Sequence, residues 1–374
     1  MKKKITIIGA GIAGLTLGNF LQNNSNYEFT ICEKEESLNL TEGFGIQLAV
    51  NSVSILNKIG FSELNKSNIF NPQTLDFYSN LDKVCDLDLT QFNTEIEKYT
   101  TLKRSSLIKF LKDKLFSNVF RFSKTIKTLE YTHDKIKINF TDGGTDETDY
   151  LVVSDGVYSP TKTIIENKKT KINFKGAFAA RTTISKNNLK TFNKENISLT
   201  MCPNAHLVVY PVNENEYNFV SIIRNKANVS DDKNREFLNN ILKQNNLNIL
   251  FDKDISFWPI YKSNKPAISK YENIFYLGDA FYTFLPTMAQ GASQSIESAE
   301  ELFKIFEKDN NNKRDIYFAN RLERIETIDR RSNFNFFSFH FSNLIMQKIR
   351  NMLLKLLIKR KAFIKAYLNP VYKE

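Results

Sequence analysis

Three glycines near the N-terminus, Gly9, Gly11 and Gly14, have a spacing that can bind phosphate groups. They follow a β-prone run over residues 5–8 and precede a helical apolar pattern over residues 15–21. In a strand–turn–helix of this kind, Gly9 permits the tight turn, Gly11 lets the backbone approach a pyrophosphate, and Gly14 lets the helix pack close to the strand. The helix N-terminus adds free N–H groups and the positive end of its dipole. The loop predicted to cradle a pyrophosphate is Gly9, Ala10, Gly11, Ile12, Ala13 and Gly14.

An acidic residue stands at the end of the next predicted strand. Residues 29–32 have the pattern of a strand, and Glu33 follows it, about 20 residues after the glycines. A carboxylate at this place can accept hydrogen bonds from both hydroxyls of an adenosine ribose and would repel a 2′-phosphate. The combined pattern therefore predicts a dinucleotide fold for FAD or NAD rather than NADP. The alternative, a glycine turn that only packs, stays open at this point.

Two more residues lie where a predicted element begins or ends. Arg104 begins an amphipathic helix over residues 104–115, where the helix dipole disfavours a cation. It is either a surface charge or a cation directed at a phosphate or a ribityl chain. Asp155 follows a short apolar strand over residues 151–154 and precedes a helix start. Its carboxylate lies either beside a ligand or in an ordinary turn.

The stretch from residue 273 to residue 299 carries the strongest single signal. A buried strand ends in Gly-Asp, and a loop with one proline then leads to a helix start made of small residues. Small residues let a flat ligand lie against the backbone, and the helix N-terminus can stabilise negative charge that develops on the ligand. The residues concerned are Gly278, Asp279, Pro286, Gly291 and Ala292.

Composition and charge narrow the class of protein. Of the 374 residues, 41% are hydrophobic and 13% aromatic, as expected for a globular chain with a substantial core. The net charge of +11 is dispersed over mixed runs except near the C-terminus, so no nucleic-acid partner is expected. Three scattered cysteines and three scattered histidines predict neither a disulfide framework nor a metal site. Because no cleavage site or long apolar segment is recognisable, a cytoplasmic location is expected.

These motifs occur in an order that resembles the single-component FAD-dependent aromatic hydroxylases, the class that includes para-hydroxybenzoate hydroxylase, salicylate hydroxylase and kynurenine monooxygenase. The resemblance covers roughly residues 4–340, and the ordered set is more specific than any one motif. The matching segments are G-A-G-I-A-G at 9–14 with Glu33, G-F-G-I-Q-L at 43–48 with Asn51, R-S-S-L at 104–107, S-D-G-V-Y-S at 154–159, the stretch 278–299, and Y-F-A-N-R-L-E-R at 317–324.

The resemblance implies a fold of class α/β, or α+β overall. A Rossmann-like FAD-binding domain would be interleaved with a mostly antiparallel β-sheet substrate domain and followed by C-terminal helices. The FAD-binding domain would comprise residues 1–70, 101–171 and 263–333, the substrate domain 71–100 and 172–262, and the C-terminal helical region 334–374.

The resemblance also implies a monooxygenase reaction. NADH or NADPH would reduce FAD, molecular oxygen would form a flavin C4a-hydroperoxide, and the aromatic or other activated ring of a small-molecule substrate would be hydroxylated. Pro286, Gly291 and Ala292 would border the isoalloxazine and are the expected catalytic residues. The residues expected to bind FAD are Gly9, Ala10, Gly11, Ile12, Ala13, Gly14, Glu33, Lys34, Gln47, Arg104, Asp155, Gly278, Asp279, Pro286, Gly291 and Ala292.

Pro160, Thr161 and Lys162 replace the usual x-V-R after the Asp-Gly motif, and four positions of the stretch 278–299 also depart from the family pattern. Tyr282 replaces the usual His, Ala289 a Gly, Ser293 an Asn and Ser298 an Asp. These departures leave the substrate and the handling of NADH or NADPH open. The alternative functions are other chemistry on the same fold, namely an epoxidase, a halogenase or an isoprenoid reductase, and a non-catalytic FAD-binding protein.

Candidates for substrate contact come from the second predicted sheet, and Arg181 is the one expected to meet an acidic substrate. Each candidate is either a ligand contact or a packing or surface residue. The chain is expected to be a monomer or a homodimer. The candidates are Arg181, His206, Tyr210, Phe219 and Trp258.

The C-terminal run over residues 352–365 combines apolar and basic residues at helical spacing and contains no acid. One interpretation is a helix that packs on the FAD-binding domain and presents a cationic outer face. The other is a peripheral contact with an anionic membrane.

Overall fold

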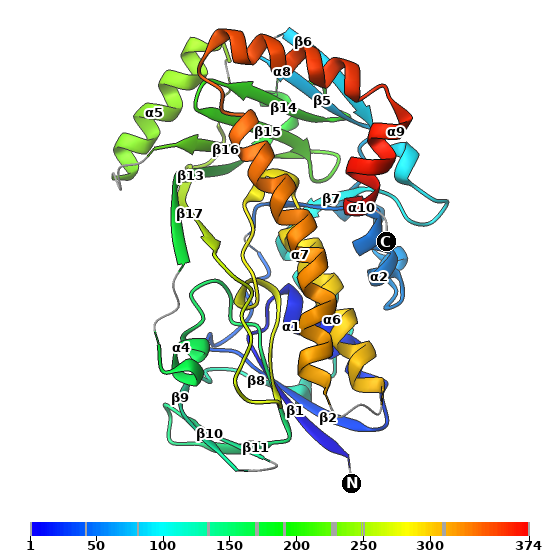
Figure 1. Cartoon of the computed structure of the whole chain (residues 1–374), viewed down its shortest axis with the longest axis vertical. Coiled ribbons are helices and arrows are strands. Elements are labelled where there is room, and N and C mark those ends of the chain that lie inside the picture. The colour runs from blue at the N-terminus through cyan, green and yellow to red at the C-terminus, as the bar shows by residue number, and fades with distance from the viewer. Residues whose placement is uncertain are drawn as a thin grey trace.

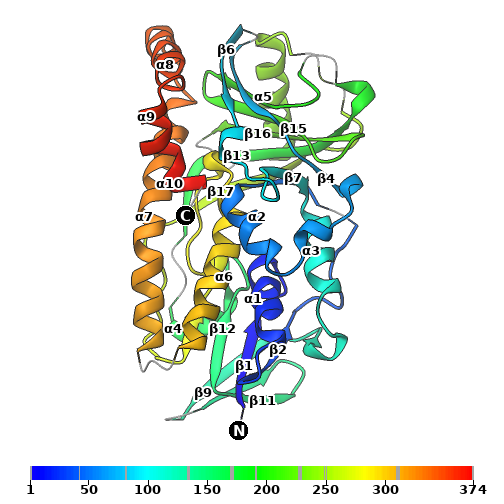
Figure 2. The same cartoon turned by 90° about the vertical axis from the view of Figure 1, so that its right-hand side faces the viewer.

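The computed structural model describes residues 2–372 apart from 42, 81, 133–134, 169–171, 190–191, 226–229, 248, 250 and 309–311. The molecule is elongated, with a parallel sheet near the N-terminus at one end and a larger sheet at the other (Figure 1). Helix α7 (Lys313–Ser338) runs along the long axis and connects the two ends (Figures 1 and 2). Residues from both ends of the molecule line the cavity that is described below as the candidate site.

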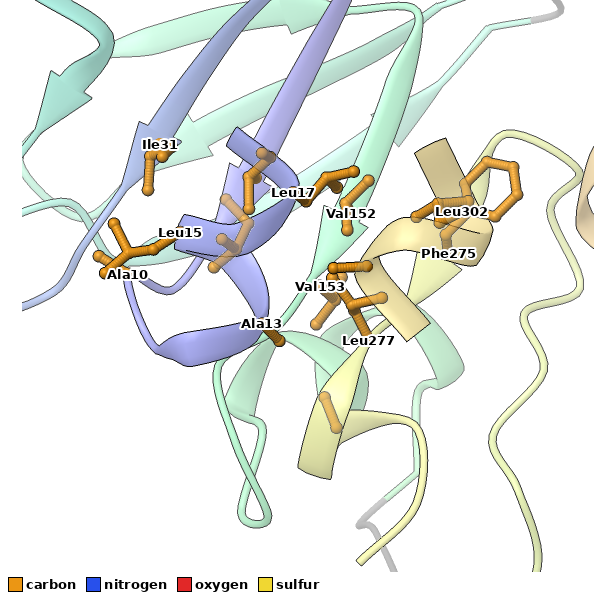
Figure 3. Close-up of a cluster of buried hydrophobic side chains, with 14 of the residues drawn as sticks. Ala10, Ala13, Leu15, Leu17, Ile31, Val152, Val153, Phe275, Leu277 and Leu302 are labelled. Carbon is orange, nitrogen blue, oxygen red and sulfur yellow. The ribbon is translucent and has the colours of Figure 1, made fainter. Parts of the chain in front are cut away.

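The first sheet is fully parallel, with strand order β18-β12-β1-β2-β8. Its central strands are continuous apolar runs because helices bury them, as parallel sheets require. Figure 3 shows Leu15 and Leu17 of α1, Val152 and Val153 of β12, and Leu302 of α6 packed in this core. The elements are β1 (Lys3–Ile8), α1 (Ile12–Gln22), β2 (Tyr27–Cys32), α3 (Arg104–Asp113), β8 (Phe120–Arg121), β12 (Tyr150–Val153), α4 (Pro160–Glu166), β18 (Ile274–Tyr276) and α6 (Gly291–Glu307).

Two small antiparallel sheets flank this core. One extends the parallel sheet away from the site, and the other joins the glycine-containing segment at residues 43–48 to the strand that precedes Arg104. The first consists of β9 (Ile126–Tyr131), β10 (Ile136–Phe140) and β11 (Thr145–Thr148). The second consists of β3 (Gly45–Leu48), β4 (Ile69–Phe70) and β7 (Thr100–Lys103), next to helix α2 (Val50–Asn57).

The second large sheet has seven strands in the order β17-β13-β16-β15-β14-β5-β6. Every neighbouring pair is antiparallel except β14 with β5, so the prediction of a mostly antiparallel sheet is confirmed. Helix α5 (Asp231–Gln244) packs on one face, and the other face is turned toward the site. The strands are β5 (Thr74–Ser79), β6 (Asp82–Asp88), β13 (Ile172–Ser185), β14 (Ile197–Cys202), β15 (Ala205–Pro211), β16 (Glu216–Arg224) and β17 (Ser256–Ser263).

The α/β fold class is therefore as expected, with β5 and β6 reaching the second sheet from an early part of the chain. The exact domain boundaries stay a prediction. After α7 come α8 (Leu344–Leu357), α9 (Lys361–Phe363), a π-helical turn (Ile364–Leu368) and α10 (Asn369–Tyr372). The continuous helical pattern expected over residues 352–365 is thus interrupted at 358–360. Among the described residues, no helix is long and apolar enough to cross a membrane.

Short 3-10 turns complete the chain. They are Phe61–Glu63, Lys66–Asn68, Thr90–Phe92, Ser117–Val119, Lys186–Asn188, Gly278–Ala280 and Pro286–Met288.

Candidate functional site

The glycine loop connects β1 to α1, and its three glycines meet different surroundings. A Cβ on Gly9, whose φ is +99°, would lie 2.7 Å from the carbonyl oxygen of Ser154. A Cβ on Gly14 would lie 2.2 Å from the carbonyl oxygen of Gly9. A Cβ on Gly11 would have no heavy atom of the described residues within 4 Å. Gly9 and Gly14 are therefore required by packing, whereas Gly11 leaves room for a ligand.

Glu33 reaches the glycine loop from the end of β2. Its Oε2 accepts a hydrogen bond from the Ala10 N–H at 2.8 Å, and its Oε1 accepts one from the Glu35 N–H at 3.2 Å. These bonds hold the carboxylate beside the loop, where a ribose would follow the pyrophosphate. The Lys34 side chain is exposed and forms an ion pair with Glu35, with 3.4 Å between Nζ and Oε1. Its role in binding a cofactor stays a prediction.

Arg104 and Asp279 lie close enough for each charge to influence the pKa of the other. Burial raises the pKa of Asp279 to about 6, although the Arg104 guanidinium acts in the other direction. Burial also lowers the pKa of Arg104, and the carboxylates of Asp279 and Glu33 oppose this shift. Protein atoms surround both residues closely enough to cause these shifts, yet each side chain keeps a solvent-exposed part that a bound ligand would cover. This pair can hold a phosphate or hydroxyl group between a cation and an acceptor.

The Asp-Gly segment lies next to the glycine loop and is tied to the Gly-Asp segment. Asp155 Oδ2 accepts the Thr161 N–H at 3.2 Å, while its buried Oδ1 has no hydrogen-bond partner in the described parts of the chain. Lys162 donates from Nζ to the carbonyl oxygen of Ala280 at 2.9 Å. The unpartnered Oδ1 is available to a hydrogen-bond donor on a ligand.

A polar cavity of about 270 Å³ lies between the N-terminus of α6 and the seven-stranded sheet. It brings expected cofactor residues and expected substrate residues together. A Cβ on Gly291 would have no heavy atom of the described residues within 4 Å, so a flat group can approach the start of α6. The predicted residues that line this cavity are Gln47, Arg181, His206, Tyr210, Asp279, Pro286, Gly291 and Ala292.

An apolar cavity of about 120 Å³ adjoins the polar one. The two cavities share Gln47, His206, Val208, Pro286 and Ala289 as lining residues. Aliphatic and aromatic side chains of β5, β6, β14 and the C-terminal helices form most of the remaining wall. A ring held next to Pro286 could therefore extend an apolar substituent toward the C-terminal helices.

Arg181 presents a positive charge to the polar cavity without an ion-pair partner. No Asp or Glu of the described residues forms an ion pair with it, and its buried Nε has no hydrogen-bond partner there. Burial lowers the pKa of Arg181, with the Tyr210 hydroxyl acting in the opposite direction. The guanidinium lies 6.0 Å from the centre of the Phe44 ring. An anionic group on a ligand would compensate this buried charge.

His206 and His340 form a buried pair beside both cavities. His340 Nδ1 lies 2.7 Å from the Phe336 carbonyl oxygen, and His340 Nε2 lies 2.8 Å from His206 Nδ1. Burial lowers the pKa of His340 to about 4 and that of His206 well below its usual range. Both rings are therefore neutral at pH 7. Because a carbonyl only accepts, His340 Nδ1 carries its proton, and His206 Nδ1 must donate to His340 Nε2.

Two of the expected substrate contacts, Phe219 and Trp258, lie away from both cavities. Phe219 packs against Phe251 in the core under α5, with ring centroids 5.0 Å apart. Successive residues of a strand point to opposite faces, so Asn218 and Val220 line the polar cavity and Phe219 cannot. Trp258 of β17 is 56% exposed and lines neither cavity.

Two further residues at the site went unrecognised in the sequence, one that lines a cavity and one that lies behind His206. Tyr99 lines the apolar cavity and donates from its hydroxyl to Gln47 Oε1 at 2.8 Å. His340 acts through His206, which is 134 residues away in the chain. No local pattern marks either residue. His133, one of the three histidines in the sequence, lies outside the described residues.

The departures from the family pattern occupy packed positions. Tyr282 is buried, and its hydroxyl faces Asp329. Ala289 has a left-handed φ of +53°, a conformation that normally favours the glycine it replaces. Ser293 Oγ lies 3.0 Å from Ser52 Oγ, and Ser298 Oγ donates to the Ser295 carbonyl oxygen at 3.0 Å.

Comparison with known proteins agrees with this geometry. The family model described as FAD binding domain matches residues 2–324. The chain is 24% identical to 3-amino-4-hydroxybenzoate 2-monooxygenase PtmB3 of Streptomyces platensis, over 94% of this chain and 92% of that protein. It is also 24% identical to 6-hydroxynicotinate 3-monooxygenase of Bordetella bronchiseptica, over 89% and 91% of the two chains.

Solved structures show the same fold. Klebsiella pneumoniae HpxO complexed with FAD and uric acid superposes with a TM-score of 0.82 at 16% identity, covering 95% of this chain and 93% of that one. A salicylate hydroxylase substrate complex gives a TM-score of 0.76 at 16% identity, covering 100% and 98%. Since the family model spans most of the sequence, this chain belongs to the FAD binding domain family, and its cofactor is FAD.

Proposed function

We propose that this protein is a monooxygenase that uses NADH or NADPH to reduce FAD and hydroxylates a small aromatic ring. The observation that carries the proposal is the polar cavity, where Asp279, Pro286 and Gly291 lie opposite Arg181 and His206. FAD, when bound and reduced, supplies the activation of oxygen. The chain's own residues bind, orient and enclose the reactants.

The residues of the cleft fit each part of FAD. Glu33 would accept hydrogen bonds from the adenosine ribose, and the loop at Gly11 would receive the pyrophosphate. Arg104 would contact a phosphate or the ribityl chain, and Asp279 would accept from a ribityl hydroxyl. The open N-terminus of α6 at Gly291 would border the isoalloxazine and favour negative charge on it.

The substrate-facing side fits a ring that carries a hydroxyl and an anionic group. The relatives named above act on 3-amino-4-hydroxybenzoate and 6-hydroxynicotinate, which are both hydroxylated ring acids. Arg181 supplies an uncompensated cation for a carboxylate. His206 Nδ1 is engaged by His340, so Nε2 is the nitrogen left for a ligand, and it is unprotonated. It would accept a hydrogen bond from a ring hydroxyl, which makes the ring more electron-rich.

The proposal is tested on the purified full-length chain. We expect a yellow protein that contains FAD, whose oxidation of NADH or NADPH accelerates with a ring acid from a panel that includes the two compounds above. Labelled oxygen gas should place one labelled atom in the product. If the compounds of the panel accelerate oxidation of NADH or NADPH but the only product is hydrogen peroxide, hydroxylation of these rings is not supported. A colourless protein that takes up no FAD on reconstitution would overturn the proposal.

We expect His206→Leu to lower kcat/KM for a hydroxylated ring acid by about 10- to 100-fold, because the ring hydroxyl loses an acceptor in a buried site. The FAD content should be unchanged, since His206 lies outside the residues that surround the glycine loop and Arg104. The control is the ring acid whose hydroxyl is replaced by methoxy, which cannot donate. Binding of that analogue, followed by flavin fluorescence, should be similar in both proteins. An equal loss for both ligands would mean that His206 acts only by packing.

A further inference from the structure

Helix α8 exposes a row of large apolar residues and buries two polar ones, Gln347 and Arg350. Gln347 and Arg350 point inward, where Gln347 Nε2 donates to the Phe341 carbonyl oxygen at 2.9 Å and Arg350 donates to Ser79 Oγ at 3.2 Å. The helix packs on β6 of the seven-stranded sheet. For α8, which includes residues 352–357 of the expected run, the packing partner is therefore the second sheet and not the FAD-binding domain, and its outer face carries large apolar residues beside the lysines. The large apolar residues of α8 that are 40–70% exposed are Leu344, Ile345, Met346, Ile349, Met352, Leu353 and Leu356.

These exposed residues form one continuous surface, which we name the apolar stripe. Its axis is Ile345, Ile349, Met352 and Leu356, whose spacing of four, three and four residues places them on one helix face. The stripe lies along the outer end of the molecule, where α8 crosses the seven-stranded sheet (Figure 1). Lys348 and Lys355 are exposed, and their spacing of seven residues places them along one side of it, while Lys359 is exposed just after the helix ends.

The charges around the stripe distinguish between possible occupants. The sequence contains no Asp or Glu between Asp329 and Glu374. A second copy related by a twofold axis would bring the same basic surface against itself, which is electrostatically unfavourable. An anionic bilayer can bind both the apolar stripe and the lysines beside it, because the apolar residues enter the interfacial region and the lysines contact the headgroups. We propose that α8 docks this protein on a membrane surface that contains anionic lipid.

The inner side of the same helix supports this choice of partner. Leu354 and Ile358 line the apolar cavity, together with Phe363 and Leu368 of the segments that follow. Docking would therefore place the wall of this cavity against the bilayer. If the proposed function holds, a ring with an apolar substituent could enter the cavity from the lipid phase.

The experiment measures sedimentation of the full-length protein with vesicles in the absence of substrate. We expect binding to vesicles of phosphatidylcholine mixed with phosphatidylglycerol, weak binding to phosphatidylcholine alone, and release at high salt. The triple variant Ile345→Ser, Ile349→Ser, Met352→Ser should bind anionic vesicles at least about tenfold more weakly. The matched control is Ile96→Ser, which removes an apolar side chain that is 68% exposed elsewhere, and its binding should be unchanged.

Equal binding of the triple variant and the wild type would overturn the proposal, as would no preference for anionic vesicles. A wild-type dimer that becomes monomeric in the triple variant, without vesicle binding, would show that a second copy covers the stripe. Circular dichroism of each variant checks that it is folded. If the protein hydroxylates a water-soluble ring acid but does not bind vesicles, only the membrane proposal is rejected. If it binds vesicles but takes up no FAD, only the proposed function is rejected.

Discussion

Gly11→Val is expected to weaken FAD binding on the order of 100-fold while the protein stays folded. The backbone φ at Gly11 is −81°, which any residue can adopt, and a Cβ there meets no heavy atom of the described residues within 4 Å. The added side chain therefore occupies only the space expected for the pyrophosphate. A steric clash between the valine side chain and bound FAD that costs about 3 kcal/mol corresponds to the expected loss of affinity. The measurement is an FAD titration followed by the change in flavin fluorescence.

Gly14→Val is the matched comparison. Its side chain would collide with the Gly9 carbonyl oxygen, at 2.2 Å from the new Cβ, so the strand, the loop and α1 would have to separate. We expect this variant to lose the fold, seen in urea unfolding or in insoluble expression. Gly11→Val should instead keep the unfolding midpoint of the FAD-free wild type. If Gly11→Val binds FAD as tightly as the wild type, the pyrophosphate does not lie at this loop.

Glu297→Gln is expected to destabilise the protein by about 3–5 kcal/mol, because it removes the carboxylate from a buried ion network. Glu297 is 3% exposed and accepts two hydrogen bonds of 2.7 Å from Arg324, and Arg321 Nη1 lies 3.4 Å away. Burial alone would raise the pKa of Glu297, but the two arginines outweigh it and lower the pKa. The carboxylate is thus ionised at pH 7, and its loss leaves buried cations uncompensated.

The same network connects distant parts of the chain. Asn51 of α2 donates to Glu297, and Arg324 donates to the Pro370 and Val371 carbonyl oxygens near the C-terminus. The measurement is the urea midpoint at a fixed FAD concentration. The control is Glu326→Gln, an exposed position on α7, where we expect a change within about 0.5 kcal/mol. A loss below 1 kcal/mol for Glu297→Gln would show that the arginines find other partners or water.

The sequence was sufficient where a short segment determines its own conformation. The strand, glycine loop and helix around Gly9 to Gly14 form as predicted, because the apolar run and the glycines act within a few residues. Arg104 begins α3, and Gly291 begins α6, as the helical patterns indicated. The buried strand before Gly278 pairs in parallel with β12, which its continuous apolar run favours.

Contacts between residues far apart in the chain were decided by the tertiary structure. His206 is in a strand and His340 follows α7, so only the packing of α7 on the sheet brings their nitrogens to 2.8 Å. Which strand residues face the cavity depends on the register. Tyr210 pairs with Asn218 and faces inward, while the neighbouring Phe219 is turned to the opposite face. Periodicity gives the two faces of a strand but does not say which one meets the cofactor.

The glycine pattern also shows the limit of what the sequence alone determines. It identified a dinucleotide loop, but only the surroundings show that Gly9 and Gly14 serve packing and Gly11 leaves space. Helix α8 shows the same limit more strongly, since the sequence indicated only that the run over residues 352–365 combines apolar and basic residues at helical spacing. The polar residues Gln347 and Arg350 find partners inside, so the apolar side is turned outward. Local sequence thus determined the elements and their faces, and tertiary packing decided which face each element buries.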